Sequence, residues 1–132
     1  MIRRGSETVV ICVDFDGTCV THDFPRIGKD IGAVPVLKEL VENEHQLVLF
    51  TMRSGDSLDE AVQWFKDNDI ELYGINVNPS QSKWTESPKA HGNIYIDDLA
   101  LGAPLVYDTT TSSRMYINWD AVRVMLKSLG VI

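Results

Sequence analysis

Residues 8–18 have the sequence TVVICVDFDGT, and this stretch decides how the rest of the chain is interpreted. Residues 8–13 are apolar and rich in β-branched side chains, which is typical of a short strand buried on both faces. Asp14 and Asp16 follow, and because side chains alternate along a strand, both carboxylates can point the same way. Gly17 then permits a tight turn. Two facing carboxylates repel unless a proton or cation lies between them, so the stretch predicts a charged site.

Outside this stretch, helical and strand patterns alternate along the chain. Ser57 and Glu60 have capping-box spacing for one helix, and Asn118 can cap a last helix that ends at Gly130. Strands that alternate with helices imply right-handed crossovers, so we expect an α/β fold with a mainly parallel sheet in three layers, flanked by helices. The other predicted elements are a helix from Pro35 and strands over residues 46–51, 71–75, 93–96 and 115–117.

Length and composition favour a single domain over residues 1–132. The net charge of −7 argues against nucleic acid and anionic membranes as partners. No stretch approaches the roughly 20 apolar residues of a membrane span, and residues 1–5 run into the first strand without a signal-peptide cleavage site. Cys12 and Cys19 lack zinc-type or redox-type spacing. We therefore expect reduced thiols and a cytoplasmic location.

Polar side chains also follow two later strands. Thr51 could hydrogen-bond a phosphate oxygen, although a threonine there is commonly only a strand-end residue. Asp97 and Asp98 follow the strand over 93–96, where adjacent acids commonly just begin a turn. Ligands of parallel sheets gather beyond the carboxyl ends of the strands, so these acids are expected to meet the pair that follows the first strand. Such oxygen clusters suit Mg²⁺. A solvated turn or a calcium loop could also account for residues 14–16, but the further ligands of an EF-hand are missing.

The order Asp-x-Asp-Gly-Thr, Thr, Lys and Asp-Asp resembles the haloacid dehalogenase-like (HAD) superfamily over nearly the whole chain. The resemblance implies a Rossmann-like sheet and a Mg²⁺-dependent phosphatase that hydrolyses phosphate monoesters through an aspartyl-phosphate. Asp14 resembles the nucleophile, and Asp16 the general acid and base whose backbone carbonyl also ligates the metal. Thr51 resembles the hydroxyl that holds the phosphoryl group, and Asp97 with Asp98 the acids that complete the metal shell. An acid at position 16 favours ester cleavage over dehalogenation, because a departing halide needs no proton.

The family's lysine has two candidates, Lys83 and Lys89, and we favour Lys89 as the residue that reaches the nucleophile and the phosphate. Arg53 is a candidate for contact with substrate or phosphate, and a helix-start ion pair is an equal alternative. Three further residues could line the mouth of the site, each with packing or surface exposure as the alternative: His22, Arg26 and Trp84.

The segments 18–35 and 51–89 are too short to hold a cap domain, so the chain resembles the capless family members. An open site either accepts a large substrate or borrows a lid from a partner subunit, which makes a homo-oligomer a candidate. A receiver-like phospho-acceptor module would place its acceptor after the third strand, where residue 76 is Asn. Two more hypotheses stay open: a catalytically weak binding or regulatory protein, and an enzyme acting on nucleotides or nucleic-acid ends. The phosphorylated substrate is not identified by the sequence.

Overall fold

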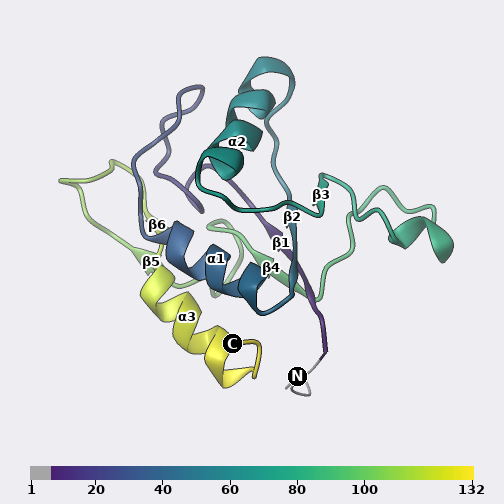
Figure 1. Cartoon of the computed structure of the whole chain (residues 1–132). Helices are drawn as coiled ribbons and strands as arrows, with labels where there is room; N and C mark the ends of the chain where they lie inside the picture. The colour runs from purple at the N-terminus through teal and green to yellow at the C-terminus, as the bar shows by residue number, and fades with distance from the viewer. Residues whose placement is uncertain (1–6) are drawn as a thin grey trace.

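A computed structural model describes residues 7–132, so the expectation about residues 1–5 lies outside the described residues. The fold is α/β and Rossmann-like, as predicted, with a parallel sheet in the order β3-β2-β1-β4 (Figure 1). No helix among residues 7–132 is long and apolar enough to cross a membrane. The strands of the sheet are β1 (Val10–Val13), β2 (Gln46–Leu49), β3 (Gly74–Ile75) and β4 (Ile94–Ile96).

The register of the sheet brings the ends of β1, β2 and β4 to one level. Val13 lies opposite both Leu49 and Ile96. The ladder continues one residue further, because the Phe50 amide donates to the Val13 carbonyl at 2.8 Å and the Asp14 amide donates to the Ile96 carbonyl at 3.0 Å. The residues that leave these strands therefore emerge side by side at the carboxyl edge.

One face of the sheet is covered by the helices α1 (Ala33–Glu42), α2 (Gly55–Asp67) and α3 (Trp119–Ser128). Their buried side chains share one core with Ile11 and Val13 of β1. The topology explains this placement, because β1, β2 and β3 follow one another in one direction and right-handed crossovers then put α1 and α2 on the same face. Each fully buried leucine or valine in this core contributes roughly 1.5–3 kcal/mol.

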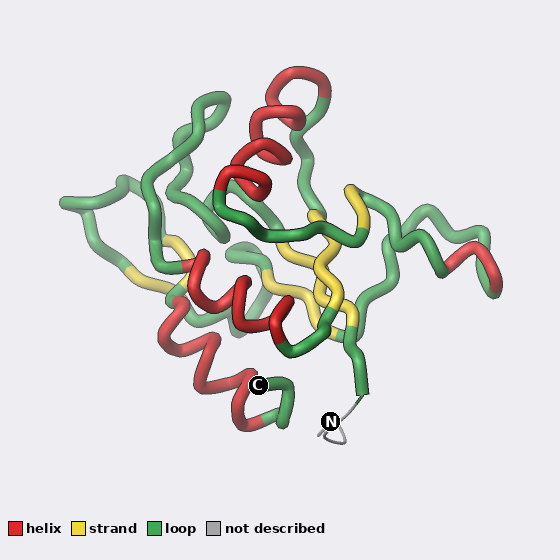
Figure 2. The backbone as a smooth tube through the Cα atoms, in the orientation of Figure 1, coloured by secondary structure: helices red, strands yellow, loops and turns green. Residues whose placement is uncertain are grey.

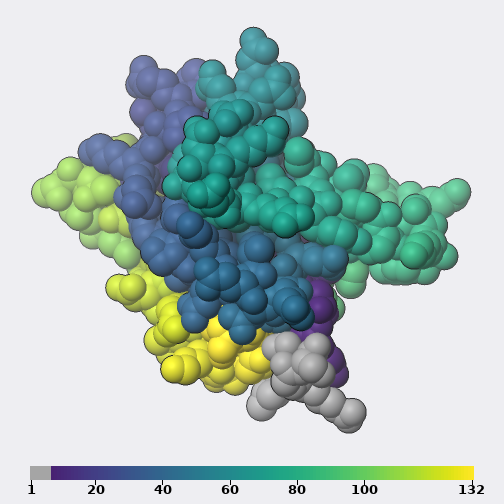
Figure 3. All heavy atoms as spheres, in the orientation of Figure 1, coloured from purple at the N-terminus to yellow at the C-terminus, as the bar shows by residue number. Residues whose placement is uncertain are grey.

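The second face is covered by irregular chain, so the expected helical layer there is not confirmed. The connection from β3 to β4 reverses direction across the sheet and must cross this face. Between these strands the described chain forms only a short 3-10 turn, η1 (Gln81–Lys83). Its Ala90 packs on Cys12 and Val48 in a small second core. The segment projects from the body of the molecule on the side opposite the loop that joins β5 to β6 (Figure 3).

Hydrogen bonds from side-chain amides stabilise this segment, which has almost no helical hydrogen bonds of its own. The buried Gln81 donates to the carbonyls of Ser87 at 3.0 Å and Lys89 at 2.7 Å, and accepts from the His91 amide at 2.7 Å. The buried Asn78 donates to the His91 carbonyl at 2.9 Å. Prolines at both ends of the segment disfavour a helix, and these amides satisfy the buried backbone groups instead.

The last predicted strand is present, but it is not part of the parallel sheet. The strand β6 (Tyr116–Ile117) pairs antiparallel with β5 (Leu105–Val106), which was not predicted, in a separate two-stranded sheet (Figure 2). The helix α3 begins as expected, because the Asn118 side chain accepts from the Ala121 amide at 3.1 Å. The predicted capping box at Ser57 is wrong. α2 begins two residues earlier, at Gly55, and the Ser57 hydroxyl instead donates to the Ser54 carbonyl at 2.8 Å.

Candidate functional site

Three carboxylates meet at the carboxyl edge of the sheet. Asp14, Asp97 and Asp98 each offer one oxygen, and these oxygens all lie within 4.8 Å of one another. Asp14 follows β1, and the other two follow β4, which lies on the opposite side of β1 from β2. The strand order reverses between β1 and β4, and such a switch point is where open α/β sheets bind ligands. We call Asp14, Asp97 and Asp98 the acid triad.

Thr18 holds two members of the acid triad together. Its fully buried hydroxyl lies 3.1 Å from Asp14 Oδ2 and 3.2 Å from Asp98 Oδ1, and it accepts from the Asp98 amide at 3.1 Å. A hydroxyl has a single proton to donate, so the two carboxylates compete for it. Thr18 belongs to the first motif, but sequence reasoning gave it no role; the signal was its position four residues after Asp14.

Gly17 makes room for a second contact with Asp98. Its φ is +80°, and a Cβ there would lie 2.5 Å from Asp98 Oδ2 and would clash with the His22 ring. The His22 Nε2 atom lies 2.8 Å from Asp98 Oδ2, and only 15% of its side chain is exposed. The structure therefore places His22 at the acid triad. The Gly-Thr pair is needed here for close approach as well as for the turn.

The carboxylates of the acid triad repel one another when no cation is bound. Burial, followed by the negative charge of Asp97, raises the pKa of Asp14 to about 8 from its ordinary value of 3.8. The hydrogen bond from the Phe15 amide opposes this rise but does not cancel it. A proton or a metal ion relieves the repulsion, and the hard oxygen ligands fit Mg²⁺.

The raised pKa predicts how stability responds to pH and Mg²⁺. Between its ordinary and its raised pKa, Asp14 binds a proton more tightly in the folded state, so the metal-free protein loses stability as pH rises from about 4 to about 8. Mg²⁺ at about 100 times its dissociation constant is expected to add about 2.7 kcal/mol near pH 9, but only about 0.4 kcal/mol near pH 6, where the proton competes. Thermal unfolding with Mg²⁺ or chelator at both pH values measures this. Equal stabilisation by Mg²⁺ at the two pH values would contradict the prediction that Asp14 is protonated near pH 6.

Asp16 lies apart from the acid triad because its carboxylate is bound by Arg53. The Arg53 Nε atom donates to Asp16 Oδ2 at 2.8 Å and Nη2 donates to Oδ1 at 2.7 Å, which is a bidentate pair. The Asp16 side chain is 17% exposed and that of Arg53 is completely buried. The Asp16 carboxylate is therefore engaged by Arg53, and it is not part of the acid triad.

Arg53 has no N–H group left for a phosphate. Its remaining donors reach the carbonyls of Pro25 at 3.1 Å, Ser57 at 3.0 Å and Arg26 at 2.8 Å, which accounts for all five guanidinium protons. The guanidinium also lies over the rings of Phe15, at 4.9 Å, and Phe24, at 5.2 Å. This geometry favours the ion-pair alternative over a substrate contact, because Arg53 joins the loop after β1 to the start of α2.

Thr51 lies one residue beyond the level of Asp14, on the neighbouring strand. Its amide donates to the Asn76 side chain at 2.8 Å, and its hydroxyl oxygen accepts from the Arg53 amide at 3.2 Å. The hydroxyl proton is not used in these bonds, so Thr51 can still donate to a phosphate oxygen.

Neither candidate lysine joins the acid triad. Lys89 Nζ lies 5.5 Å from the centre of the Tyr95 ring, and Tyr95 is level with Cys12 of the second core. Among residues 7–132, neither Lys89 nor the exposed Lys83 forms an ion pair with an aspartate. The reason is the path of the chain, since the segment before β4 crosses the second face and the acids follow the far end of that strand.

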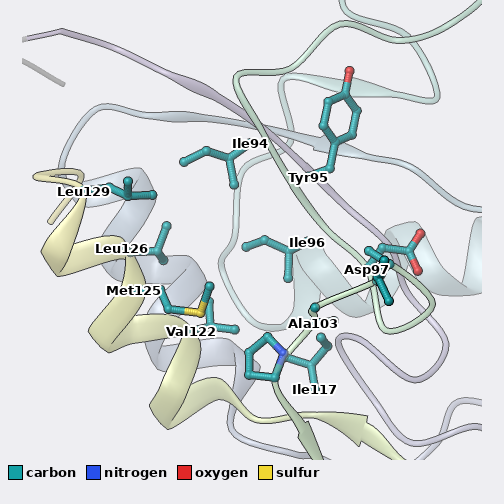
Figure 4. A pocket seen from close by; sticks show the side chains of 14 residues that line it. Ile94, Tyr95, Ile96, Asp97, Ala103, Ile117, Val122, Met125, Leu126 and Leu129 are labelled. Atoms are coloured by element: carbon teal, nitrogen blue, oxygen red, sulfur yellow. The ribbon is translucent and has the colours of Figure 1, made fainter. Parts of the chain in front are cut away.

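A separate pocket of about 220 Å³ lies between β4 and α3 on the helical face (Figure 4). Its lining is aliphatic, with Ile94, Ile96 and Leu126 facing one another. Asp97 borders it, but Figure 4 shows its carboxylate pointing away from the α3 side chains. The pocket therefore marks loose packing beside the edge strand rather than an extension of the acid triad.

Fold and site together define an α/β protein with three carboxylates at the switch point of a parallel sheet. The structure of a conserved protein from Bacteroides thetaiotaomicron is similar, with a TM-score of 0.74, 35% sequence identity and an alignment that covers 92% of each chain. The chain belongs to the same family as this Bacteroides protein. No family model and no curated protein matches the chain.

Proposed function

We propose that the protein is a Mg²⁺-dependent phosphohydrolase of the HAD type, which cleaves phosphate monoesters through a phosphorylated Asp14. The observation that carries the proposal is the acid triad, whose oxygens lie within 4.8 Å of one another at the switch point. The HAD-like class of the fold is part of the same proposal. Its second helical layer would be replaced here by the irregular segment between β3 and β4.

Mg²⁺, when bound, would offset the charge of the triad and of the phosphate in the transition state. The Asp97 and Asp98 carboxylates would hold it, with an oxygen of Asp14 and the backbone carbonyl of Asp16. Thr18 keeps Asp14 and Asp98 in place, and Thr51 donates its free hydroxyl proton to the transferring phosphoryl group.

The proposed reaction has two displacement steps at phosphorus. In the first, an Asp14 oxygen forms a bond to phosphorus while the bond to the ester oxygen breaks, and the departing oxygen takes up a proton. In the second, water attacks phosphorus and gives a proton to Asp16, which had lost one to the departing oxygen in the first step, while the bond to Asp14 breaks and inorganic phosphate leaves. Asp16 is the proposed proton donor and acceptor, which requires it to leave Arg53.

A second candidate function is a protein of the same fold that binds metal and phosphate but turns over weakly. The bidentate pair between Asp16 and Arg53 favours it, because the acid is engaged. The absence of Lys83 and Lys89 from the acid triad, within the described residues 7–132, is a further reason.

Turnover of a generic aryl phosphate, measured with Mg²⁺ and with chelator, separates the two candidates. The phosphohydrolase is expected to release phosphate only with Mg²⁺. Acid-quenched protein should carry one phosphoryl group on the peptide that contains Asp14, detected by mass spectrometry. Mg²⁺ binding without turnover would support the binding protein, and turnover in chelator would exclude the acid triad as the site.

A further inference from the structure

The loops that leave β1, β2 and β4 at the carboxyl edge each carry a large apolar side chain that is more than half exposed. Phe24 is 61% exposed, Met52 is 98% exposed and Leu99 is 77% exposed. We call these residues the apolar rim. Apolar side chains that gather around a charged site mark a binding surface more than scattered exposure does, and methionine adapts to varied ligands.

The register places Met52 and Leu99 on either side of Asp14. Phe50 and Asp97 are level with Asp14 on the two flanking strands, and Met52 and Leu99 each come two residues later. With a strand spacing of about 4.8 Å and at most about 3.8 Å per residue, both Cα atoms lie within about 12 Å of that of Asp14. This distance is short enough for both side chains to reach a ring attached directly to a phosphate on Asp14.

The third residue of the apolar rim, Phe24, lies near Arg53. The guanidinium of Arg53 lies 5.2 Å from the centre of its ring. Because Arg53 also holds Asp16, the Phe24 ring lies beside the engaged acid. Its exposed area faces solvent and remains open to contact with a planar group.

The ion pair of Asp16 with Arg53 limits which leaving groups the site can release. Both oxygens of Asp16 accept from Arg53, so proton donation to the departing oxygen costs two charge-assisted hydrogen bonds. An aryl oxide, whose conjugate acid resembles the tyrosine side chain with a pKa of about 10, needs this proton far less than an alkoxide does.

The charges near the acid triad disfavour a second anionic group on the substrate. Three cations of the loops after β1 and β2 already have partners. Arg26 pairs with Asp23 at 3.1 Å, Lys29 donates to the Thr111 carbonyl at 3.1 Å, and the donors of Arg53 are all used. An additional phosphate or carboxylate would therefore meet acidic surroundings with little compensation.

From the apolar rim, the Asp16–Arg53 pair and these charges, we infer that the substrate is an aryl phosphate monoester with no other anionic group. The inference rests on the proposed phosphohydrolase function. The phosphate would lie at Asp14, and the aromatic ring would lie against Phe24, Met52 and Leu99.

Binding of two phosphonates tests the inference without any leaving group. In the presence of Mg²⁺, calorimetry on the full chain should show phenylphosphonate binding at least about tenfold more tightly than methylphosphonate, as burial of a ring face predicts. In the double variant Met52→Ser/Leu99→Ser this ratio should fall to about two or less. The variant should fold, because both side chains are exposed. The same variant should lose about tenfold in kcat/KM for phenyl phosphate relative to methyl phosphate.

Val124→Ser is the matched control, since Val124 is 69% exposed on α3 and should leave the ratio unchanged. Equal affinity of the wild type for both phosphonates would overturn the inference, even if phosphatase activity is present. A preference that survives Met52→Ser/Leu99→Ser would overturn it as well. Loss of a concentration-dependent dimer in that variant, with the phosphonate ratio unchanged, would assign the apolar rim to a second copy of the chain. If neither phosphonate bound in Mg²⁺, the proposed function itself would fail.

Discussion

Asp14→Asn is expected to lower phosphatase turnover by at least about 10⁴-fold, because the amide cannot attack phosphorus. The same change is expected to stabilise the metal-free protein by about 1–2 kcal/mol near pH 9, after allowance for solvent screening. The physical reason is that Asn has nearly the same shape but removes a charge that burial disfavours and that Asp97 repels. A loss of activity together with a gain in stability distinguishes a functional acid from a structural one.

Steady-state turnover and chemical denaturation measure the two effects on the same preparations. Asp59→Asn is the matched control, since Asp59 is an exposed residue of α2, away from the acid triad. It should change neither quantity appreciably. Activity that survives in Asp14→Asn would exclude Asp14 as the nucleophile. A less stable Asp14→Asn protein at high pH would contradict the electrostatic description of the triad.

Arg53→Met is expected to destabilise the fold by about 3–5 kcal/mol, the usual cost of removing one partner of a buried ion pair. It leaves the Asp16 carboxylate without its bidentate partner. The carbonyls of Pro25, Ser57 and Arg26 also lose their donors. Chemical denaturation compared with the wild type measures the loss.

The double variant Arg53→Met/Asp16→Asn keeps this prediction testable if the single variant does not fold. Removing both charges should recover about half or more of the lost stability, because the uncompensated carboxylate is the larger part of the cost. Arg26→Met is the control, since the Arg26 side chain is 79% exposed in its ion pair and should cost under about 1 kcal/mol. A loss below that value in Arg53→Met would show that the buried pair does not organise the loops.

Much of the fold followed from local patterns. The apolar runs that became β1 and β2 are continuous, and strands buried on both faces have this pattern. The helix α3 was anticipated from Asn118, because capping is a local interaction. The meeting of Asp14 with Asp97 and Asp98 was also anticipated, since parallel strands bring their carboxyl ends to one edge.

Several features depend on contacts between distant parts of the chain. No local signal distinguishes the ion pair of Arg53 with Asp16 from a substrate contact, because 37 residues separate the partners. The position of Lys89 before β4 favoured a place at the site, whereas the path of the chain across the second face takes it to Tyr95. The strand β5 is too short to have a pattern of its own, and it exists only through pairing with β6.

The order of residues along the chain was thus sufficient to place three acids at one sheet edge, because strand direction and side-chain alternation are local properties. It was not sufficient to show which polar partners each acid keeps. Asp14 faces two other carboxylates, whereas Asp16, two residues away, is neutralised by a buried guanidinium. That difference arises from packing of the loop after β1 against the start of α2, and only the folded arrangement of distant segments produces it.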